Sequence, residues 1–164
     1  MTAESTLMTS APMQTAMADP ALRHIETEDE LRACLPLMRE LRPHLVDTDD
    51  FTARIRRMRD QRYHLLAGID GDTPVALAGY RYQENLLYGR FMYVDDLVVD
   101  ASRRGGRWGA RLLQALDGLA RHAGCAKLVL DTGLANSLAQ RFYFRQGLLS
   151  KGLHFSKNLD TTTA

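Results

Sequence analysis

A segment rich in glycine and arginine carries the clearest chemical signal in the sequence. It runs from Leu97 to Gly109, where an apolar β-branched run gives way to small and basic residues. Apolar residues then recur at steps of three and four from Trp108 to Ala123, which predicts an amphipathic helix. A strand that turns directly into a helix leaves several backbone N–H groups without partners, at the positive end of the helix dipole. Together with three arginines these donors form a seat for a phosphate or pyrophosphate; the arginines are Arg103, Arg104 and Arg107.

An ordinary strand-to-helix connection with solvated arginines fits the same segment equally well, so the segment alone leaves both interpretations open. Its glycine spacing does exclude the two best-known phosphate loops. No Lys-Ser or Lys-Thr follows the glycines, as a P-loop requires. Gly105, Gly106 and Gly109 also lack the Gly-x-Gly-x-x-Gly spacing of dinucleotide-binding folds. A different phosphate-bearing cofactor is indicated.

A second motif follows a predicted strand at Lys127–Asp131. It runs from Asn136 to Gly147 and predicts a helix, with Asn136 as the N-cap and Gly147 as the C-terminal stop. The pattern Asn-x-x-Ala-x-x-Phe-Tyr-x-x-x-Gly after a strand, preceded by Arg-x-x-x-x-Gly at the start of a helix, resembles the GNAT superfamily of N-acetyltransferases. Members of that superfamily bind acetyl-CoA and transfer its acetyl group to an amine.

The resemblance extends over residues 22–159, nearly the whole chain. Two further strings, at Tyr93–Leu97 and His154–Lys157, resemble one bacterial branch of small GNAT proteins, and that branch does not specify a substrate.

The resemblance implies a role for each matching residue. The backbone from Leu97 to Val99 would pair with the pantetheine arm of acetyl-CoA, as an added strand does. Backbone N–H groups in the following loop would hold the pyrophosphate. Asn136 would hydrogen-bond the cofactor near its thioester, and Tyr143 would stand close to the sulfur. The implied cofactor-binding residues are Leu97, Val98, Val99, Arg104, Gly105, Gly106, Arg107, Trp108, Gly109, Ala110 and Asn136.

Arg107 departs from the family pattern, which usually has glycine at this position. The periodicity places Arg107 in the first helical turn, where a residue with a side chain is allowed, so we expect the loop to keep its shape. The sequence leaves two effects of the guanidinium open. It adds a charge-assisted contact to a phosphate, or it narrows the cofactor groove.

Acetyl transfer to an amine needs a neutral amine and a proton for the departing thiolate. Tyr143 is the candidate acid, because a phenol with a pKa of about 10 can protonate a thiolate. The alternative is a core tyrosine between Phe142 and Phe144. Three successive aromatic side chains cannot share one helix face, however, so at least one of them points elsewhere.

Asp95 and Asp96 are the candidate bases, because two carboxylates stand in the middle of an otherwise apolar strand. Alternation along the strand predicts that their side chains lie on opposite faces of the sheet. The alternative for each is a structural carboxylate bonded to Arg81 or His154. Two further candidates, which would act through a water molecule, are Tyr93 and Glu84.

The predicted elements follow the order β-α-α-β-β-β-α-β-α-β-β, which indicates an α/β (α+β) fold: a mixed, mostly antiparallel central sheet with helices on both faces. A capping box at Thr27–Glu30 begins the first helix, and Asp47 or Thr48 caps the second. Glycine at position 71 predicts a hairpin between two strands. The expected strands are 22–26, 63–70, 75–82, 88–99, 127–131 and closing strands from 148 to 157; the helices run towards residue 41, from 48 to 59, from 108 to 123 and from 136 to 147.

The composition predicts one domain over residues 21–160, after a tail at residues 1–20 that is polar, unpatterned and expected to be disordered. A net charge of +1 argues against nucleic acid as a partner, and the apolar runs are too short to span a membrane. Cys34 and Cys125, in a chain without a secretory signal pattern, indicate reduced thiols in the cytoplasm. The five histidines show no metal-ligand spacing, so no metal is expected. Similar proteins are often homodimers, but no heptad or patch in the sequence specifies one.

The sequence therefore predicts an acetyl-CoA-dependent N-acetyltransferase. The acetyl group passes directly to a primary amine in a ternary complex, and a small-molecule acceptor is favoured over a protein. The alternative is a catalytically inactive acyl-CoA-binding sensor, in which a phenol at the sulfur would have no use.

Overall fold

The computed structural model describes residues 19–159, and the chain divides into two units, one ending at Leu130 and the other beginning at Asp131. The tail predicted at residues 1–20 lies almost wholly outside the described residues. The single domain expected over residues 21–160 remains a prediction.

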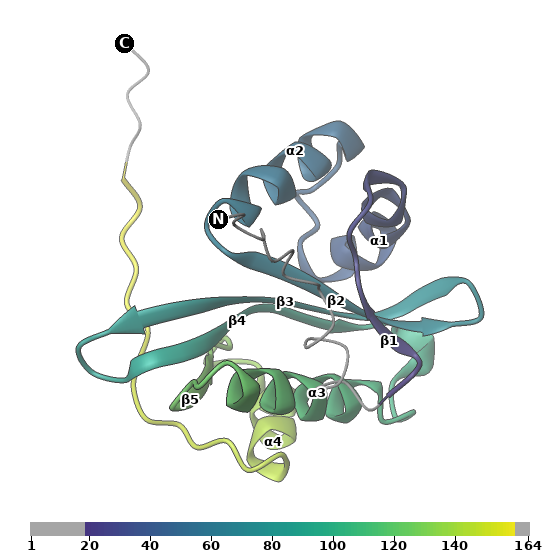
Figure 1. The fold of residues 1–164 in the computed structure, drawn as a ribbon. Coiled ribbons are helices and arrows are strands. Elements are labelled where there is room, and N and C mark those ends of the chain that lie inside the picture. Colours follow the sequence, from purple (N-terminus) through teal and green to yellow (C-terminus); the bar gives the residue numbers. More distant parts are fainter. Residues whose placement is uncertain (1–18, 160–164) are drawn as a thin grey trace, which may run out of the picture. The chain divides into compact units, whose positions relative to one another are not determined.

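The first unit is built on a five-stranded sheet in the order β1-β2-β3-β4-β5 (Figure 1). The first four strands are antiparallel to their neighbours, and β5 runs parallel to β4. This confirms the expected mixed, mostly antiparallel sheet. The strands are β1 (Leu22–His24), β2 (Tyr63–Asp70), β3 (Thr73–Asn85), β4 (Gly89–Val99) and β5 (Lys127–Leu130).

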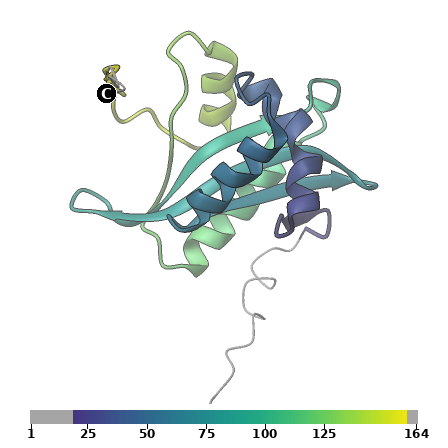
Figure 2. The ribbon, with the colours of Figure 1, turned by 90° about the horizontal axis from the view of Figure 1, so that it is seen from above.

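Helices cover both faces of this sheet, as predicted. The helices α1 (Glu28–Leu41) and α2 (Thr48–Arg59) lie on one face, and α3 (Trp108–His122) lies on the other (Figure 1). Figure 2 shows α1 and α2 side by side across the strands. Their apolar faces close a core with β2, β3 and β4 that includes Phe51, Tyr63 and Val98.

Local capping sets where the first two helices begin. The Thr27 hydroxyl accepts from the Glu30 backbone N–H, and the Glu30 carboxylate accepts from the Thr27 N–H, which completes the predicted capping box. Asp47 caps α2 by accepting from the Asp50 N–H at 2.7 Å. Both caps depend only on residues three apart, which is why the sequence alone predicts them.

A β-bulge interrupts β4 at Asp95. Gly79 pairs with Asp96 and Tyr80 pairs with Val94, so Asp95 has no partner on β3. One extra residue shifts the alternation of side chains, and both aspartates therefore lie on the face covered by α1 and α2. The expectation that they lie on opposite faces is wrong, because strict alternation assumes an unbroken ladder.

The sheet opens at the same place. Pairing between β4 and β5 ends at Val94 and Leu130, immediately before the bulge. Within the described chain, the stretch of β4 from Asp96 to Val99 pairs with β3 only.

The second unit contains one helix, α4 (Ser137–Arg145). The Asn136 side chain accepts from the Ala139 N–H at 3.1 Å, and Gly147 has a φ of +82°, so both predicted boundary residues are confirmed. Residues 148–159 form no strand, so the closing strands expected up to position 157 are wrong. Apolar alternation yields a strand only where a neighbour completes the backbone ladder, and no described strand pairs with this segment.

Candidate functional site

Both carboxylate oxygens of Asp96 are bonded inside the first unit. Arg42 Nε donates to Oδ1 at 2.9 Å, and the Tyr63 hydroxyl donates to Oδ2 at 3.0 Å. Burial raises the pKa of Tyr63 well above its usual value, and the nearby Asp96 charge adds to the shift, so the phenol stays a donor. Asp96 thus ties the end of α1 to β2.

Gly79 makes the space for this contact. A Cβ atom at residue 79 would lie 2.6 Å from Tyr63 Cζ and 2.8 Å from Asp96 Oδ2. No side chain fits there without displacing one of the two partners. A glycine inside a strand is a sequence signal for such close approach, although it does not reveal which groups approach.

Asp95 has a different environment. Arg81 Nε donates to its Oδ2 at 2.9 Å, and Arg42 Nη2 donates to its backbone carbonyl at 3.0 Å. Burial raises the pKa of Asp95, and the neighbouring Asp96 charge adds to this, whereas Arg81 opposes it. The side chain keeps 21% of its exposure, about twice that of Asp96 at 11%. Asp95 is therefore the more accessible of the two carboxylates.

Arg81 links Asp95 to the start of β2. Its Nη1 donates to Gln61 Oε1 at 3.1 Å, and its guanidinium lies 5.6 Å from the centre of the Tyr63 ring. Arg81 is one of the two structural partners predicted for the aspartates. The other, His154, is paired with Asp131 at 3.0 Å within the second unit.

The open edge of β4 begins beside Asp95. Leu97, Val98 and Val99 pair with β3 on one edge, and no described strand lies along the other. The backbone of a strand carries N–H and C=O groups on both edges. The free edge can therefore bond to an extended ligand in the manner of an added strand.

The glycine- and arginine-rich loop connects β4 to α3 and begins with a short 3-10 turn at Ala101–Arg103. Arg103 forms an ion pair with Asp70 at 2.6 Å, whereas Arg104 lies 3.8 Å from Glu40, at the limit of an ion pair. Of the three arginines proposed to face a phosphate, Arg103 has a close counter-charge in the described chain and Arg104 a more distant one.

Arg107 does not lie in the first helical turn. It is the N-cap of α3 and has a φ of +63°, in the left-handed region that favours glycine. The expectation based on helical periodicity is wrong by one position, because α3 begins at Trp108 and Arg107 is the residue that precedes its first turn. The left-handed backbone at Arg107 carries strain of about 1 to 2 kcal/mol, which a glycine at this position would not carry.

The start of α3 leaves donors free of intrahelical bonds. The first helical hydrogen bond runs from the Arg111 N–H to the Arg107 carbonyl at 2.9 Å. The N–H groups of residues 108–110 therefore have no acceptor within the helix. Together with the helix dipole they form a site suited to an anion.

The Trp108 side chain anchors this helix end. A Cβ atom at Gly68 of β2 would lie 2.7 Å from Trp108 Cε3, so the indole occupies space that only glycine leaves. The Arg111 guanidinium stacks on the indole at 4.0 Å from the ring centre and bonds both oxygens of Asp19, at 2.6 and 2.7 Å. The indole thus packs against protein, and the backbone N–H is the group of Trp108 that is left to bond a ligand.

In the second unit, Asn136 and Tyr143 lie on one face of α4, because seven residues make two helical turns. The Asn136 side-chain oxygen is used as the helix cap, which leaves its amide N–H groups as donors. Tyr143 is half-buried, its ring packs 5.5 Å from that of Phe142, and burial raises its pKa.

Sequence reasoning missed Arg42, Tyr63 and Gly79, which together hold Asp96. Among the described residues, no group of three or more His, Cys, Asp or Glu side chains is placed to hold a metal ion. Likewise, none of the described helices is long and apolar enough to cross a membrane.

Comparison with known proteins gives a consistent result. Residues 22–148 match the model of the acetyltransferase (GNAT) family. The glucosamine 6-phosphate N-acetyltransferase of Arabidopsis thaliana is 25% identical over 146 residues, covering 85% of this chain and 96% of that protein. The aminoalkylphosphonate N-acetyltransferase of Salmonella typhimurium is 29% identical over 143 residues, covering 84% and 90%.

Among solved structures, an aminoglycoside N-acetyltransferase, AAC(6')-Iy, in complex with CoA, superposes with a TM-score of 0.74 at 15% identity. The match covers 84% of this chain and 93% of that one.

Proposed function

The chain belongs to the GNAT family of acetyltransferases, and on that premise we propose that it acetylates the primary amine of a small molecule by direct transfer from acetyl-CoA. The observation that carries this proposal is the coincidence, at residues 94–96, of the end of β4–β5 pairing with a pair of carboxylates. A free strand edge and a candidate base thus meet at one point of β4.

The residues of the first unit suit acetyl-CoA. The free edge from Leu97 to Val99 would bond the pantetheine amides, which need strand-like partners. The N–H groups at the start of α3 would hold the pyrophosphate. The loop glycines have no side chains, so they would let the backbone approach the phosphate oxygens closely. Arg107, at the N-cap of the same helix, would add a charge-assisted contact. When bound, acetyl-CoA supplies the activated acetyl group.

We assign the base to Asp95 rather than Asp96. Both Asp96 oxygens accept bonds from Arg42 and Tyr63, which makes Asp96 a positioning residue. Asp95 is more exposed, and its raised pKa makes its carboxylate a stronger proton acceptor. The carboxylate would take the amine proton, directly or through one water molecule, as the amine attacks.

Tyr143 is the proposed acid. Burial raises the pKa of its phenol, so the hydroxyl stays protonated until a proton is demanded. The same environment also destabilises an expelled thiolate and makes it a stronger base, which favours transfer of the phenolic proton to sulfur. Asn136, two turns away on α4, would donate its amide N–H to the cofactor near the thioester.

The two curated relatives support a small-molecule acceptor, because each is named for a small amine that carries a phosphorus oxyanion. The test is a panel of primary amines with acetyl-CoA, read by thiol release and by the mass of the product. We expect at least one small amine to gain about 42 mass units, which is the increment when an acetyl group replaces a hydrogen atom.

One substitution separates chemistry from binding. Asp95→Asn is expected to lose turnover while acetyl-CoA still raises the melting temperature. If acetyl-CoA stabilises the wild-type protein but no amine or protein is acetylated, the acyl-CoA sensor replaces the enzyme as the best description.

A further inference from the structure

The Arg81 side chain connects the turn that precedes β2 with the proposed base on β4. Arg81 pairs in register with Tyr63 of β2 on one side and with Tyr93 of β4 on the other. Its Nε donates to Asp95 Oδ2 at 2.9 Å, and its Nη1 donates to Gln61 Oε1 at 3.1 Å. Only 14% of the Arg81 side chain is exposed, so the guanidinium is held in one place among these partners.

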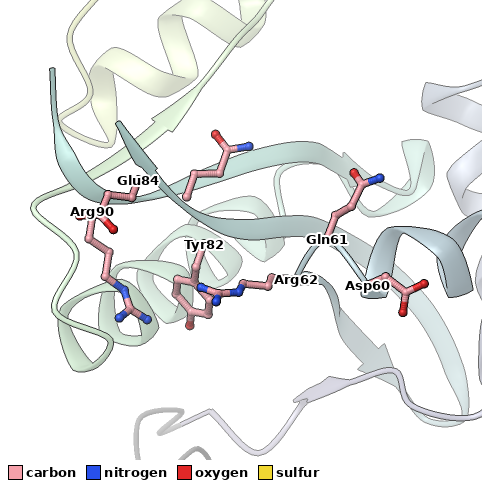
Figure 3. A pocket seen from close by; sticks show the side chains of 7 residues that line it. Asp60, Gln61, Arg62, Tyr82, Glu84 and Arg90 are labelled. Atoms are coloured by element: carbon pink, nitrogen blue, oxygen red, sulfur yellow. The ribbon is translucent and has the colours of Figure 1, made fainter. Parts of the chain in front are cut away.

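The turn between α2 and β2 presents Gln61 to Arg81. The Gln61 N–H bonds to the Met58 carbonyl at 2.9 Å, and the Arg62 N–H bonds to the Arg59 carbonyl, also at 2.9 Å. Arg62 has a φ of +61°, in the left-handed region in which helices commonly end. Figure 3, a view of the pocket that this turn borders, shows the Gln61 side chain pointing away from that of Arg62. The end of α2 thus fixes the outer partner of Arg81.

Asp95 keeps one carboxylate oxygen free. Arg81 occupies Oδ2, whereas none of the described donors bonds Oδ1. The backbone carbonyl of Asp95 accepts from Arg42 Nη2 at 3.0 Å, so the backbone and the side chain are both fixed. A carboxylate accepts a further proton at lone pairs that are not already used. Oδ1 is therefore the atom of Asp95 that can take a proton from a substrate.

Charged groups on α1, β3 and β4 act on this carboxylate. Burial raises the pKa of Asp95, and the negative charge of Asp96, beside it on β4, adds to the shift. Arg81 on β3 and Arg42 at the end of α1 oppose the shift, and Arg81 does so most because it bonds the carboxylate directly. The Tyr63 phenol on β2 stays neutral, because burial raises its pKa. Arg81 is thus the main group that favours the ionised form of Asp95.

We propose that Arg81 is a positioning residue for acetyl transfer: it holds Asp95 Oδ2, keeps the carboxylate ionised and leaves Oδ1 to receive the amine proton. The proposal rests on the proposed function and on the base assigned there. As the amine nitrogen bonds the acetyl carbon, its N–H proton passes to Oδ1, the C–S bond breaks and Tyr143 protonates the sulfur. A half-buried carboxylate needs such a cation, because burial by itself favours the neutral acid, which cannot act as a base.

The first test uses two substitutions of Arg81 that separate its charge from its geometry. Arg81→Gln removes the charge, whereas Arg81→Lys keeps the charge and loses the planar guanidinium. With one accepted amine, the ratio of variant to wild-type kcat/KM is measured from pH 6 to 9, which cancels the ionisation of the amine itself. For Arg81→Gln this ratio should be about 10-fold lower at pH 6 than at pH 9, because more of the carboxyl is then neutral. For Arg81→Lys it should vary by less than about twofold.

Two matched controls accompany these variants. Arg121 also pairs with a carboxylate, that of Asp117 at 3.0 Å, but it lies on α3, so Arg121→Gln removes one charge and should leave the pH dependence unchanged. Gln61→Ala removes a bond to Arg81 and should lower kcat by about 2- to 5-fold. Gln83→Ala should not, because Gln83 is exposed on the same strand as Arg81 and makes no described bond to it.

A double substitution shows whether Arg81 acts through Asp95. Adding Arg81→Gln to Asp95→Asn should lower kcat by less than about twofold beyond Asp95→Asn alone, because no ionised carboxylate is left to position. A further loss of about 10-fold or more would show that Arg81 contacts the substrate itself, which overturns the positioning role.

The ionisation of Asp95 is also measured without a substrate, by NMR titration of protein labelled at the carboxyl carbon of aspartate. The signal that disappears in Asp95→Asn identifies Asp95. Its pKa should be higher in Arg81→Gln than in the wild-type protein and unchanged in Arg121→Gln. An unchanged pKa in Arg81→Gln overturns the proposal, even where that variant is less stable. Wild-type kcat in Asp95→Asn, or no acetylation of any amine, instead overturns the assigned base or the proposed function, and the titration still decides whether Arg81 keeps Asp95 ionised.

Discussion

The Tyr63 hydroxyl donates to Asp96 Oδ2 across 3.0 Å, over a position of β3 that has no side chain. That contact joins β2 to β4 across β3, beside the bulge that carries Asp95. It places a buried phenol, a carboxylate and the Arg42 guanidinium in one bonded group. These residues support the β4 backbone beside Asp95, and they do not themselves have to contact a substrate.

Gly79→Ala should be strongly destabilising. The new methyl group would overlap the Tyr63 ring and Asp96, and one of them must move, which breaks a buried hydrogen bond. We expect a loss of about 2 to 4 kcal/mol in unfolding free energy, measured by urea denaturation. Gly133→Ala, where a Cβ meets nothing within 4 Å, is the control and should change stability by less than about 0.5 kcal/mol. Similar losses in both variants would contradict the packing argument.

Asp95→Asn and Asp96→Asn should affect different properties, the first kcat and the second the melting temperature. Asp96→Asn weakens a bonded group and should lower the melting temperature. Asp95→Asn should lower kcat, and more at pH 7 than at pH 9, where more of the amine is already neutral.

The pH dependence of protein stability gives a second test of Asp95. The folded pKa of Asp95 is raised, so its ionised form opposes folding at neutral pH, and this penalty is relieved as the pH falls through the raised pKa. Asp95→Asn should therefore not lower the melting temperature at pH 7. A loss of stability without a pH-dependent loss of kcat would make Asp95 structural.

Arg107→Gly should stabilise the protein and preserve acetyl-CoA binding. Glycine adopts a φ of +63° without steric cost, so the unfolding free energy should rise by up to about 1 kcal/mol. Binding should persist because the pyrophosphate contacts are backbone N–H groups. Titration calorimetry at two salt concentrations measures the part due to the guanidinium, since a lost phosphate contact reduces the salt dependence. A tenfold or larger loss of affinity would show that the Arg107 side chain carries the binding.

Tyr143→Phe should separate catalysis from binding. The ring and its packing on Phe142 remain, so stability and acetyl-CoA affinity should barely change. Turnover should fall by about 100-fold, the usual effect of removing a general acid. Steady-state kinetics from pH 6 to 9 with an accepted amine provide the measurement. Wild-type turnover across that range would rule out Tyr143 as the acid.

Two histidines should make the protein sensitive to acid. Burial lowers the pKa of His24 and of His64, and His24 Nε2 lies 2.8 Å from the Tyr80 hydroxyl. A histidine with a lowered folded pKa stabilises the fold while it is neutral. That contribution begins to be lost as the pH falls below about 6.5, the unfolded value, and is gone below the folded pKa. Melting temperatures from pH 5 to 8 should show this fall, and His64→Phe, which keeps a ring beside Tyr80, should reduce it.

The features that the sequence by itself determined are those set within a few residues. Thr27, Asp47 and Asn136 each cap a helix by bonding an N–H three residues on, so residue type and spacing suffice. The two motifs around α3 and α4 likewise indicated the acetyltransferase family, which the comparisons confirmed.

Tertiary structure alone decided what depends on strand register and distant partners. The bulge at Asp95 exists only in relation to β3, and it moved both carboxylates to one face. Arg42 and Tyr63, the partners of Asp96, lie 54 and 33 residues away in sequence. Arg107 received its left-handed backbone from the path between β4 and α3. Such pairings stabilise the fold only after a long loop of chain has closed, so no local pattern of residue types predicts them.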